Sequence, residues 1–220
     1  MNYTTVQSLA TQHGLSIYGG FHGDSSDGLP DSHQTLLMLG PSPQFWAHLQ
    51  TQPEYMDSAP DPIDRWSKRT FDTLAKDLNA TPFLPFGGPP YAPFLTWAIK
   101  TNRAWSSPVG MLVHDKTGLM VSFRGALAFR EKLDLPETGR IPCTTCAQPC
   151  LSACPVDALS AENGYNTAAC HTYLNTSAGQ DCLAKGCIAR RACPVSAGAH
   201  RTADQSAHHM AYFHPKGRTP

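Results

Sequence analysis

The sequence predicts an α+β domain followed by a small cysteine-rich domain, and three observations indicate this fold class. Hydrophobic residues make up 41% of the 220 residues, which is enough to form a buried core. Helix-like and strand-like patterns are mixed over residues 1–135 without a regular strand–helix–strand alternation, which favours α+β. All eight cysteines lie between Cys143 and Cys193, so the two parts of the chain differ sharply in composition.

These differences divide the chain into four predicted segments. Residues 1–135 form a domain that binds a cofactor or substrate or docks a partner, and residues 136–142 form a linker rich in proline and glycine. Residues 143–200 form the cysteine-rich domain, and residues 201–220 form a C-terminal tail that contains histidine and arginine.

Three elements are predicted in the first eighty residues. Residues 4–13 have a helical pattern, and residues 35–40 are a continuous apolar run that ends in glycine and proline, which is typical of a buried strand. Asp61-Pro62 predicts a helix start, with aspartate as the N-cap and proline in the first turn. Apolar residues then recur at helical spacing over residues 63–78.

The next part of the chain is punctuated by proline and glycine. Residues 82–91 contain four prolines and two glycines, so we expect no regular structure there. Residues 92–101 have a helical pattern. Two apolar runs, 109–114 and 119–123, flank the turn sequence Asp-Lys-Thr-Gly, which predicts a β-hairpin.

The charges are balanced along the whole chain. Residues 1–140 carry 11 basic and 13 acidic side chains, and residues 141–220 carry 6 and 4. So weak a field cannot drive binding to phosphate backbones, so we expect no nucleic-acid partner. There is no apolar stretch of the roughly 20 residues that a membrane helix needs, and no export signal at the N-terminus. We therefore expect a cytoplasmic protein without membrane contact.

The first four cysteines have the spacing of iron–sulfur ligands. Two, three and three residues separate them, and a proline follows the last: Cys143, Cys146, Cys150, Cys154 and Pro155. The bacterial ferredoxin pattern is C-x2-C-x2-C-x3-C-P, in which three thiolates hold one cluster and the fourth ligates the other. Here the central gap is one residue longer. Without an export signal, clustered cysteines indicate a metal site rather than disulfides.

The remaining cysteines complete two sets of four. The crossing rule of the ferredoxin pattern assigns the first cluster to Cys143, Cys146, Cys150 and Cys193. It assigns the second cluster to Cys154, Cys170, Cys182 and Cys187. Eight thiolates then form two four-thiolate sites with none left over. We predict two [4Fe-4S] clusters.

Two zinc sites are the alternative, because four thiolates also suit tetrahedral Zn²⁺. Zinc modules usually pair two C-x2-C units, and this chain has only one. The two Cys-Pro pairs, Cys154-Pro155 and Cys193-Pro194, favour iron–sulfur clusters over zinc. Arg190 and Arg191 lie inside the last cysteine loop, where a cation would offset the negative charge of a thiolate-bound cluster.

With these motifs the chain resembles the epoxyqueuosine reductases and their reductive-dehalogenase relatives. The similar stretches are Cys143-Thr-Thr-Cys146, Cys150-Leu-Ser-Ala-Cys154-Pro, Cys170-His-Thr-Tyr-Leu, and Gly186-Cys187 through Cys193-Pro. The resemblance implies a bacterial-ferredoxin-like domain with two [4Fe-4S] clusters and a nitroreductase-like N-terminal domain that holds cobalamin. Residues 107–125 are similar to a strand–turn–strand segment of that N-terminal domain and of vitamin B12-processing proteins, with Asp115 in place of a proline.

This resemblance suggests candidates for a site in the N-terminal domain. The catalytic candidates are His114, Arg124 and Tyr91. The candidates for binding a cofactor such as a corrinoid are His114, Gly118, Arg124, Gly125, Gly87 and Gly88. Structural roles are the alternatives: a hydrogen-bonded turn histidine, an arginine in a surface ion pair, and a rigid connecting loop at 86–91.

The leading functional hypothesis is an enzyme, an iron–sulfur oxidoreductase that passes electrons through two clusters to a cofactor or substrate at the N-terminal domain. Its partner would be a redox protein or a small-molecule substrate. A ferredoxin-type electron carrier without a catalytic site of its own is the first alternative. A zinc-stabilised interaction module is the second.

Overall fold

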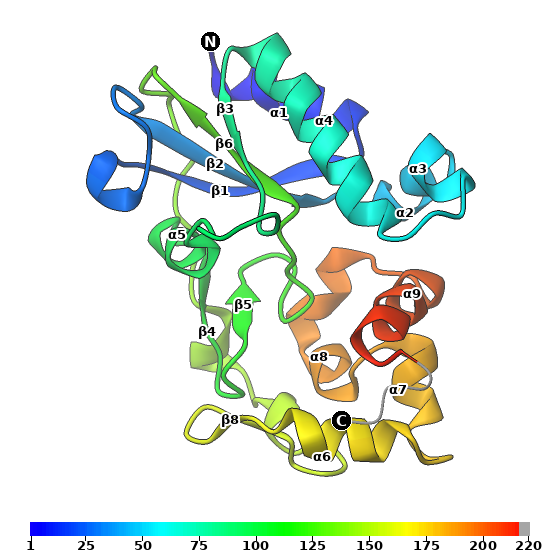
Figure 1. Cartoon of the computed structure of the whole chain (residues 1–220). Coiled ribbons are helices and arrows are strands. Elements are labelled where there is room, and N and C mark those ends of the chain that lie inside the picture. The colour runs from blue at the N-terminus through cyan, green and yellow to red at the C-terminus, as the bar shows by residue number, and fades with distance from the viewer. Residues whose placement is uncertain (216–220) are drawn as a thin grey trace. The chain divides into compact units, whose positions relative to one another are not determined.

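Residues 1–215 are described by a computed structural model, in which the chain divides into two units (Figure 1). The first unit consists of Met1–Arg103 and Ser122–Arg140. The second consists of Ala104–Val121 and the described residues from Ile141 onward. Each unit is therefore assembled from two stretches of chain, and the boundary at Arg140 falls inside the linker expected at 136–142.

One stretch belongs to a different unit from the one that the sequence pattern predicts. The pattern includes residues 104–121 in the first domain, 1–135, whereas the structure places them in the cysteine-rich unit. The physical reason is apolar burial. Val109, Val113 and Leu119 of this stretch form one buried cluster with Cys150 and Cys193.

The first unit is built on a four-stranded antiparallel sheet. Its strands, in the order β1-β2-β6-β3, are Leu15–His22, Thr35–Pro41, Gly125–Phe129 and Thr81–Phe83. The predicted strand at 35–40 is confirmed as β2, which is buried along its whole length. Strands β1 and β6 were not predicted, because each contains small residues and lacks a regular alternation of apolar and polar side chains.

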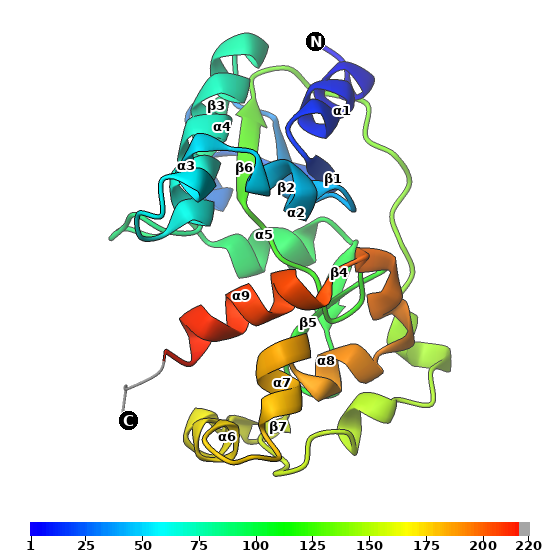
Figure 2. The ribbon, with the colours of Figure 1, turned by 90° about the vertical axis from the view of Figure 1, so that its right-hand side faces the viewer.

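Helices cover both faces of this sheet (Figures 1 and 2). The helical elements of the unit are α1 (Tyr3–Gln12), η1 (Ser25–Asp27), α2 (Phe45–Gln50), α3 (Pro53–Met56), α4 (Pro62–Leu78) and α5 (Phe94–Lys100). Leu37 and Leu39 of β2 join the core under α1, α2 and α4. Because side chains alternate along a strand, Leu36 and Met38 lie on the other face, which α5 covers. The helices predicted at 4–13, 63–78 and 92–101 are confirmed.

One local expectation in this unit is confirmed and one is wrong. Asp61 is the N-cap of α4 and Pro62 lies in its first turn, as predicted, but the Asp61 side chain makes no capping bond, and its backbone is left-handed, with φ of 54° and ψ of 49°. Its carbonyl oxygen instead accepts the Arg65 amide at 3.0 Å. Residues 82–91 were expected to be irregular, but Pro82 and Phe83 belong to β3. A proline is tolerated there because β3 is an edge strand with only β6 beside it.

The second unit contains short elements joined by tight turns. They are β4 (Ala104–Ser106), β5 (Leu112–His114), η2 (Pro142–Thr145), η3 (Pro149–Leu151), β7 (Leu159–Ser160), β8 (Gly164–Tyr165), α6 (Thr167–Leu174), α7 (Gln180–Lys185), α8 (Ile188–Ala192), η4 (Pro194–Ala199) and α9 (Ala203–Phe213). The predicted tail at 201–220 thus contains a helix, α9, which packs beside α7 (Figure 2); residues 216–220 lie outside the described residues. None of the helices in residues 1–215 combines the length and apolar character of a membrane span.

The predicted hairpin has a different partner strand. β5 pairs with β4 in register Ala104 to His114, and residues 119–123 form no strand. His114 makes only an isolated bridge to Gly118. The turn at 115–118 therefore closes on itself, and the chain then leaves the hairpin. β4 was missed because it has only three residues.

Candidate metal centres

The eight thiols line two cavities of the second unit, four in each. The first cavity is lined by Cys143, Cys146, Cys150 and Cys193, and by no other cysteine of the described residues. The second is lined by Cys154, Cys170, Cys182 and Cys187. All eight are free thiols. This division is the same as the two sets expected from the crossing rule.

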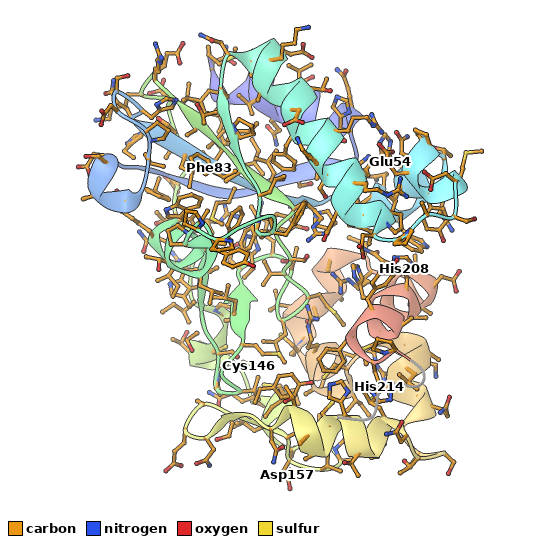
Figure 3. The ribbon with its side chains drawn as sticks, viewed as in Figure 1. Glu54, Phe83, Cys146, Asp157, His208 and His214 are labelled. Carbon is orange, nitrogen blue, oxygen red and sulfur yellow. The ribbon has the colours of Figure 1, made fainter. Side chains whose placement is uncertain are left out.

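Two short 3-10 helices position the first three thiols. Cys143 lies in η2 and Cys150 in η3, and Cys146 lies between them (Figure 3). Gln148 turns the chain between the two helices with a left-handed backbone, φ 55°. This turn also directs the Gln148 amide at the Cys146 sulfur, with a nitrogen–sulfur distance of 3.3 Å. The extra residue in the central gap, compared with the ferredoxin spacing, is used in this turn.

The second set comes from three helices and one turn. Cys170 lies on α6 and Cys182 on α7, while Cys187 immediately precedes α8. Cys154 follows η3, and its sulfur accepts the Ala158 amide at 3.3 Å. A second turn residue with positive φ, Asp157 at 46°, allows this approach. Thiolate sulfurs that accept backbone N–H bonds are a feature of iron–sulfur sites.

Helix α8 explains why the last two cysteines line different cavities. Cys187 precedes the helix and Cys193 follows it. Six residues at the helical rise of about 1.5 Å per residue separate their positions by about 9 Å along the axis. The helix therefore places one thiol at each cavity, which is how a crossed ligand pattern arises from a short loop.

The electrostatics of the thiols reflects the same grouping. Burial raises the pKa of Cys143, and the neighbouring Cys193, Cys150 and Cys146 raise it further. Burial also raises the pKa of Cys170. The Tyr165 hydroxyl opposes this increase by hydrogen bonding, whereas Cys187, Cys154 and Cys182 add to it. Cys143 and Cys170 are thus each influenced by the other three thiols of their own cavity, as expected when four ligands face one space.

The arrangement of the thiols differs from that of ligands around one ion. Among residues 1–215, no group of three or more His, Cys, Asp or Glu side chains could hold a single metal ion. Four thiolates bound to one zinc at about 2.3 Å lie only about 3.8 Å from one another. A [4Fe-4S] cluster binds each thiolate through a different iron, so its thiolates surround a larger space. Each cavity has the four thiols that such a cluster needs.

Two polar side chains complete the cavity walls. Ser107 follows β4 and lines the first cavity; it is 4% exposed, and its hydroxyl has no hydrogen-bond partner among the described residues. Arg190 of α8 lines the second cavity. Sequence patterns indicated Arg190 but not Ser107, because nothing in residues 104–107 shows that they belong with cysteines some forty residues later.

The second cavity also has aromatic side chains. Tyr165 and Phe213 line it, and their rings stack with a centroid distance of 6.1 Å and an interplanar angle of 9°. The imidazole of His171 stacks on the ring of Phe213 with a centroid distance of 4.7 Å. Its Nδ1 lies 2.6 Å from Nδ1 of His214. Figure 3 labels His214, which follows α9, and His208, which lies within that helix. The tail residues thus close one side of the second cavity.

Two of the candidates for a corrinoid site lie in the second unit and are enclosed there. His114 is 1% exposed, and its Nδ1 accepts the amide of Lys116 at 3.2 Å, as a turn histidine does. Gly118 packs against the backbone of Ser196. These contacts within the protein explain the positions of His114 and Gly118 without a bound ligand.

The other five candidates lie in the first unit. Arg124 pairs with Asp64 at 3.3 Å. Gly125 begins β6 and packs against the ring of Phe71. Gly87 and Gly88 lie in the loop after β3, where Gly87 has open space around its Cα. Tyr91, in the same loop, is 65% exposed. The structure therefore divides the candidate set between the two units.

The fold and the thiols together define a class of protein, a mixed α/β chain in which one unit carries two cavities of four cysteines each. Solved structures of epoxyqueuosine reductases have this fold. A crystal structure of selenomethionine-labelled epoxyqueuosine reductase matches with a TM-score of 0.53 and 14% sequence identity, over 91% of this chain and 67% of the other. Epoxyqueuosine reductase from Bacillus subtilis matches with a TM-score of 0.53 and 15% identity, over 91% and 66%.

These matches concern the fold. The chain spans about two thirds of the length of the two reductases. No protein-family model and no curated protein matches the sequence. The resemblance predicted from the cysteine motifs is confirmed at the level of fold, and the structure contains mixed helices and strands as expected.

Proposed function

We propose that this protein is an iron–sulfur oxidoreductase that holds two [4Fe-4S] clusters in its second unit and delivers electrons to a cofactor or substrate at its first unit. One observation carries the proposal: the eight thiols fall into two sets of four, and each set lines its own cavity. The shared fold with two epoxyqueuosine reductases supports the same class of activity.

The residues around the first cavity fit a cluster. Its wall is apolar apart from the thiols, Ser107 and Gln148; the apolar residues are Val113, Leu119, Pro142, Pro149, Pro194 and Val195. Such a wall excludes water from the thiolates, and the unpartnered Ser107 hydroxyl would donate to a sulfur atom. Bound clusters would supply one-electron transfer, at potentials set by charge, hydrogen bonds and exposure.

The domain types follow from the resemblance. We infer that the first unit is nitroreductase-like, which its antiparallel sheet with helices on both faces supports. We infer that the second unit is ferredoxin-like, with β4–β5 as an added hairpin that lines both cavities: Ser107 and Val113 at the first, and Met111 at the second.

A corrinoid at the first unit fits these residues less well. Five of the six binding candidates have their contacts supplied by the protein itself: His114, Gly118, Arg124, Gly125 and Gly88. Only Gly87, in the same loop as the exposed Tyr91, has open space beside it. Absorption and calorimetric titration of the purified protein with hydroxocobalamin would show whether one binds, and Gly87→Val should weaken that binding.

An electron carrier is the second candidate, and the second cavity favours it. Tyr165 and Phe213 line this cavity and are 39% and 37% exposed. A cluster at that position would lie close to the surface, where a redox partner could exchange electrons. A carrier would oxidise and reduce its clusters without turning over a substrate.

Anaerobic purification followed by metal and sulfide analysis tests the proposal. We expect about eight iron and about eight sulfide per chain, and a reduced protein with the electron paramagnetic resonance (EPR) spectrum of [4Fe-4S] clusters. Colourless protein with about two zinc per chain would refute it in favour of a zinc module. Dithionite-reduced protein that is reoxidised by a small substrate would indicate the enzyme, and reoxidation only by another redox protein would indicate the carrier.

A further inference from the structure

Arg190 places a cation at the wall of only one of the two cavities. It lies on α8 between Cys187 and Cys193, and its side chain lines the second cavity. Its Nε donates a hydrogen bond to the carbonyl oxygen of Leu119 at 2.6 Å. This bond fixes the base of the guanidinium, because Leu119 belongs to the buried cluster of the second unit.

The Arg190 guanidinium has no carboxylate partner among the described residues. Burial lowers its pKa, and the charges that oppose this are those of Cys187 and Tyr165. The adjacent Arg191 differs, since it pairs with Asp181 and donates to the Gly186 carbonyl at 3.1 Å. One of two neighbouring arginines is thus neutralised by an acid, and the other faces thiols.

Within residues 1–215, no charged side chain lines the first cavity. The polar side chains of this part of the chain that line it besides the thiols are Ser107 and Gln148, and both are neutral. The two sites therefore differ in charge although they have the same ligands. In a buried environment a cation a few ångströms from an anion has a much larger effect than in water.

A buried cation without a counter-ion favours the more negative of two states beside it. A four-thiolate cluster gains one negative charge when it takes one electron from a donor, and no bond forms or breaks in this step. Arg190 would therefore stabilise the reduced state at the second site, while the first site lacks this contribution.

We propose that Arg190 raises the reduction potential of the second cluster, so that this cluster is reduced before the first. The inference rests on the proposed function, since it requires both clusters. It adds an internal direction: electrons that enter the second unit collect at the site lined by Cys154, Cys170, Cys182 and Cys187.

A redox titration of the iron-loaded, full-length protein tests this, with dithionite as the donor and EPR as the readout. In Arg190→Gln we expect the higher of the two midpoint potentials to become more negative. The ratio of reduced to oxidised cluster at a fixed potential should fall at least tenfold, which is 59 mV for one electron. The lower potential should stay unchanged. Arg191→Gln combined with Asp181→Asn is the matched control, because it removes the neighbouring ion pair as a whole without a change in net charge, and it should shift the higher potential less than Arg190→Gln does. Equal potentials in Arg190→Gln and wild type would overturn the inference.

Two further experiments cover the case in which Arg190→Gln loses iron. Arg190→Lys keeps the positive charge. At a fixed potential, the ratio of reduced to oxidised second cluster in this variant should therefore stay within threefold of the wild-type ratio. In wild-type protein labelled with ¹⁵N-arginine and reduced by one electron, pulsed EPR should detect ¹⁵N coupling to the reduced cluster, because an arginine lines only the second cavity. One reduced cluster without ¹⁵N coupling would refute the inference. Protein without iron and sulfide would instead refute the proposed function.

Discussion

Gly118 lies so close to Ser196 that a Cβ atom on Gly118 would be 2.5 Å from the Ser196 backbone nitrogen. A second close approach lies nearby, since a Cβ atom on Gly198 would be 2.0 Å from the carbonyl oxygen of Lys116. These contacts join the turn at 115–118, which directly follows β5, to η4, the element that directly follows Cys193. The β4–β5 hairpin and the turn that follows it are thus a structural part of the cysteine-rich unit, although a long stretch of sequence separates them from the cysteines.

Gly118→Ala should loosen the second unit. Gly118 has a left-handed backbone, φ 55°, and an L-residue there costs about 1–2 kcal/mol before any clash. The clash with Ser196 adds to this cost. Gly164→Ala is the control, because Gly164 has φ 72° but open space around it. Hydrogen exchange of the iron-loaded protein should show faster exchange over 104–121 in Gly118→Ala than in Gly164→Ala. Equal exchange in both variants would mean that the Gly118 contact is not close.

Paired cysteine substitutions should reveal the crossed ligand sets. Cys143→Ser and Cys193→Ser belong to the same cavity, so the double variant should keep one cluster and about four iron per chain. Cys143→Ser with Cys187→Ser disrupts both cavities, so its iron content should approach zero. If Cys193 shared a cluster with Cys170, Cys182 and Cys187, the first double variant would lose both clusters. Iron and sulfide analysis of anaerobically purified protein distinguishes the two results.

The sequence predicted well those elements whose pattern is local. Helix α4 has apolar residues at helical spacing over 17 residues, and β2 is a continuous apolar run, so each was found at nearly its true bounds. The grouping of the cysteines into two sets of four could be predicted because thiols at short spacings have few other uses in such a chain. In both cases the residues that form the pattern are close to one another in the sequence.

Features that depend on distant contacts were not predictable in this way. β6 is short and rich in glycine and alanine, and it is a strand because β2 and β3 bond to it on both sides. The membership of β4–β5 in the second unit depends on Val109 and Val113 packing against cysteines far along the chain. The left-handed backbone of Asp61 is a further example, since residue type predicts this N-cap position but also a side-chain capping bond that Asp61 does not make.

The stability of the first unit should fall in mild acid because of His48. Burial lowers the pKa of His48, and the nearby His13 and Arg69 lower it further; its Nε2 is buried without a hydrogen-bond partner among the described residues. A histidine whose pKa is lower in the folded state contributes stability above its unfolded pKa of about 6.5. This contribution is lost as the pH falls from about 6.5 through the folded pKa, because the unfolded chain binds the proton first.

Urea unfolding at pH 7.5 and pH 5.5 measures this effect, with tryptophan fluorescence as the probe, since Trp46, Trp66 and Trp97 lie in the first unit. The unfolding free energy should be lower at pH 5.5 in the wild type. In His48→Gln the decrease should be smaller, because His13 is then the only described histidine of the first unit whose pKa is lowered; His208, whose pKa is also lowered, lies in the second unit. An equal decrease in both proteins would exclude His48 as the cause.

Ser107→Ala should change the potential of the first cluster and leave the second unchanged. Ser107 is the only hydroxyl among the described residues that line the first cavity, and no protein group accepts its proton. A hydrogen bond to a cluster sulfur stabilises the reduced, more negative state. Its loss costs about 1 kcal/mol, which for a one-electron couple makes the potential more negative by about 40 mV. Ser196→Ala is the matched control, since that hydroxyl is also buried without a partner but does not line the cavity. If both variants shift the first potential equally, the effect comes from general polarity of the unit, and Ser107 has no special bond to the cluster.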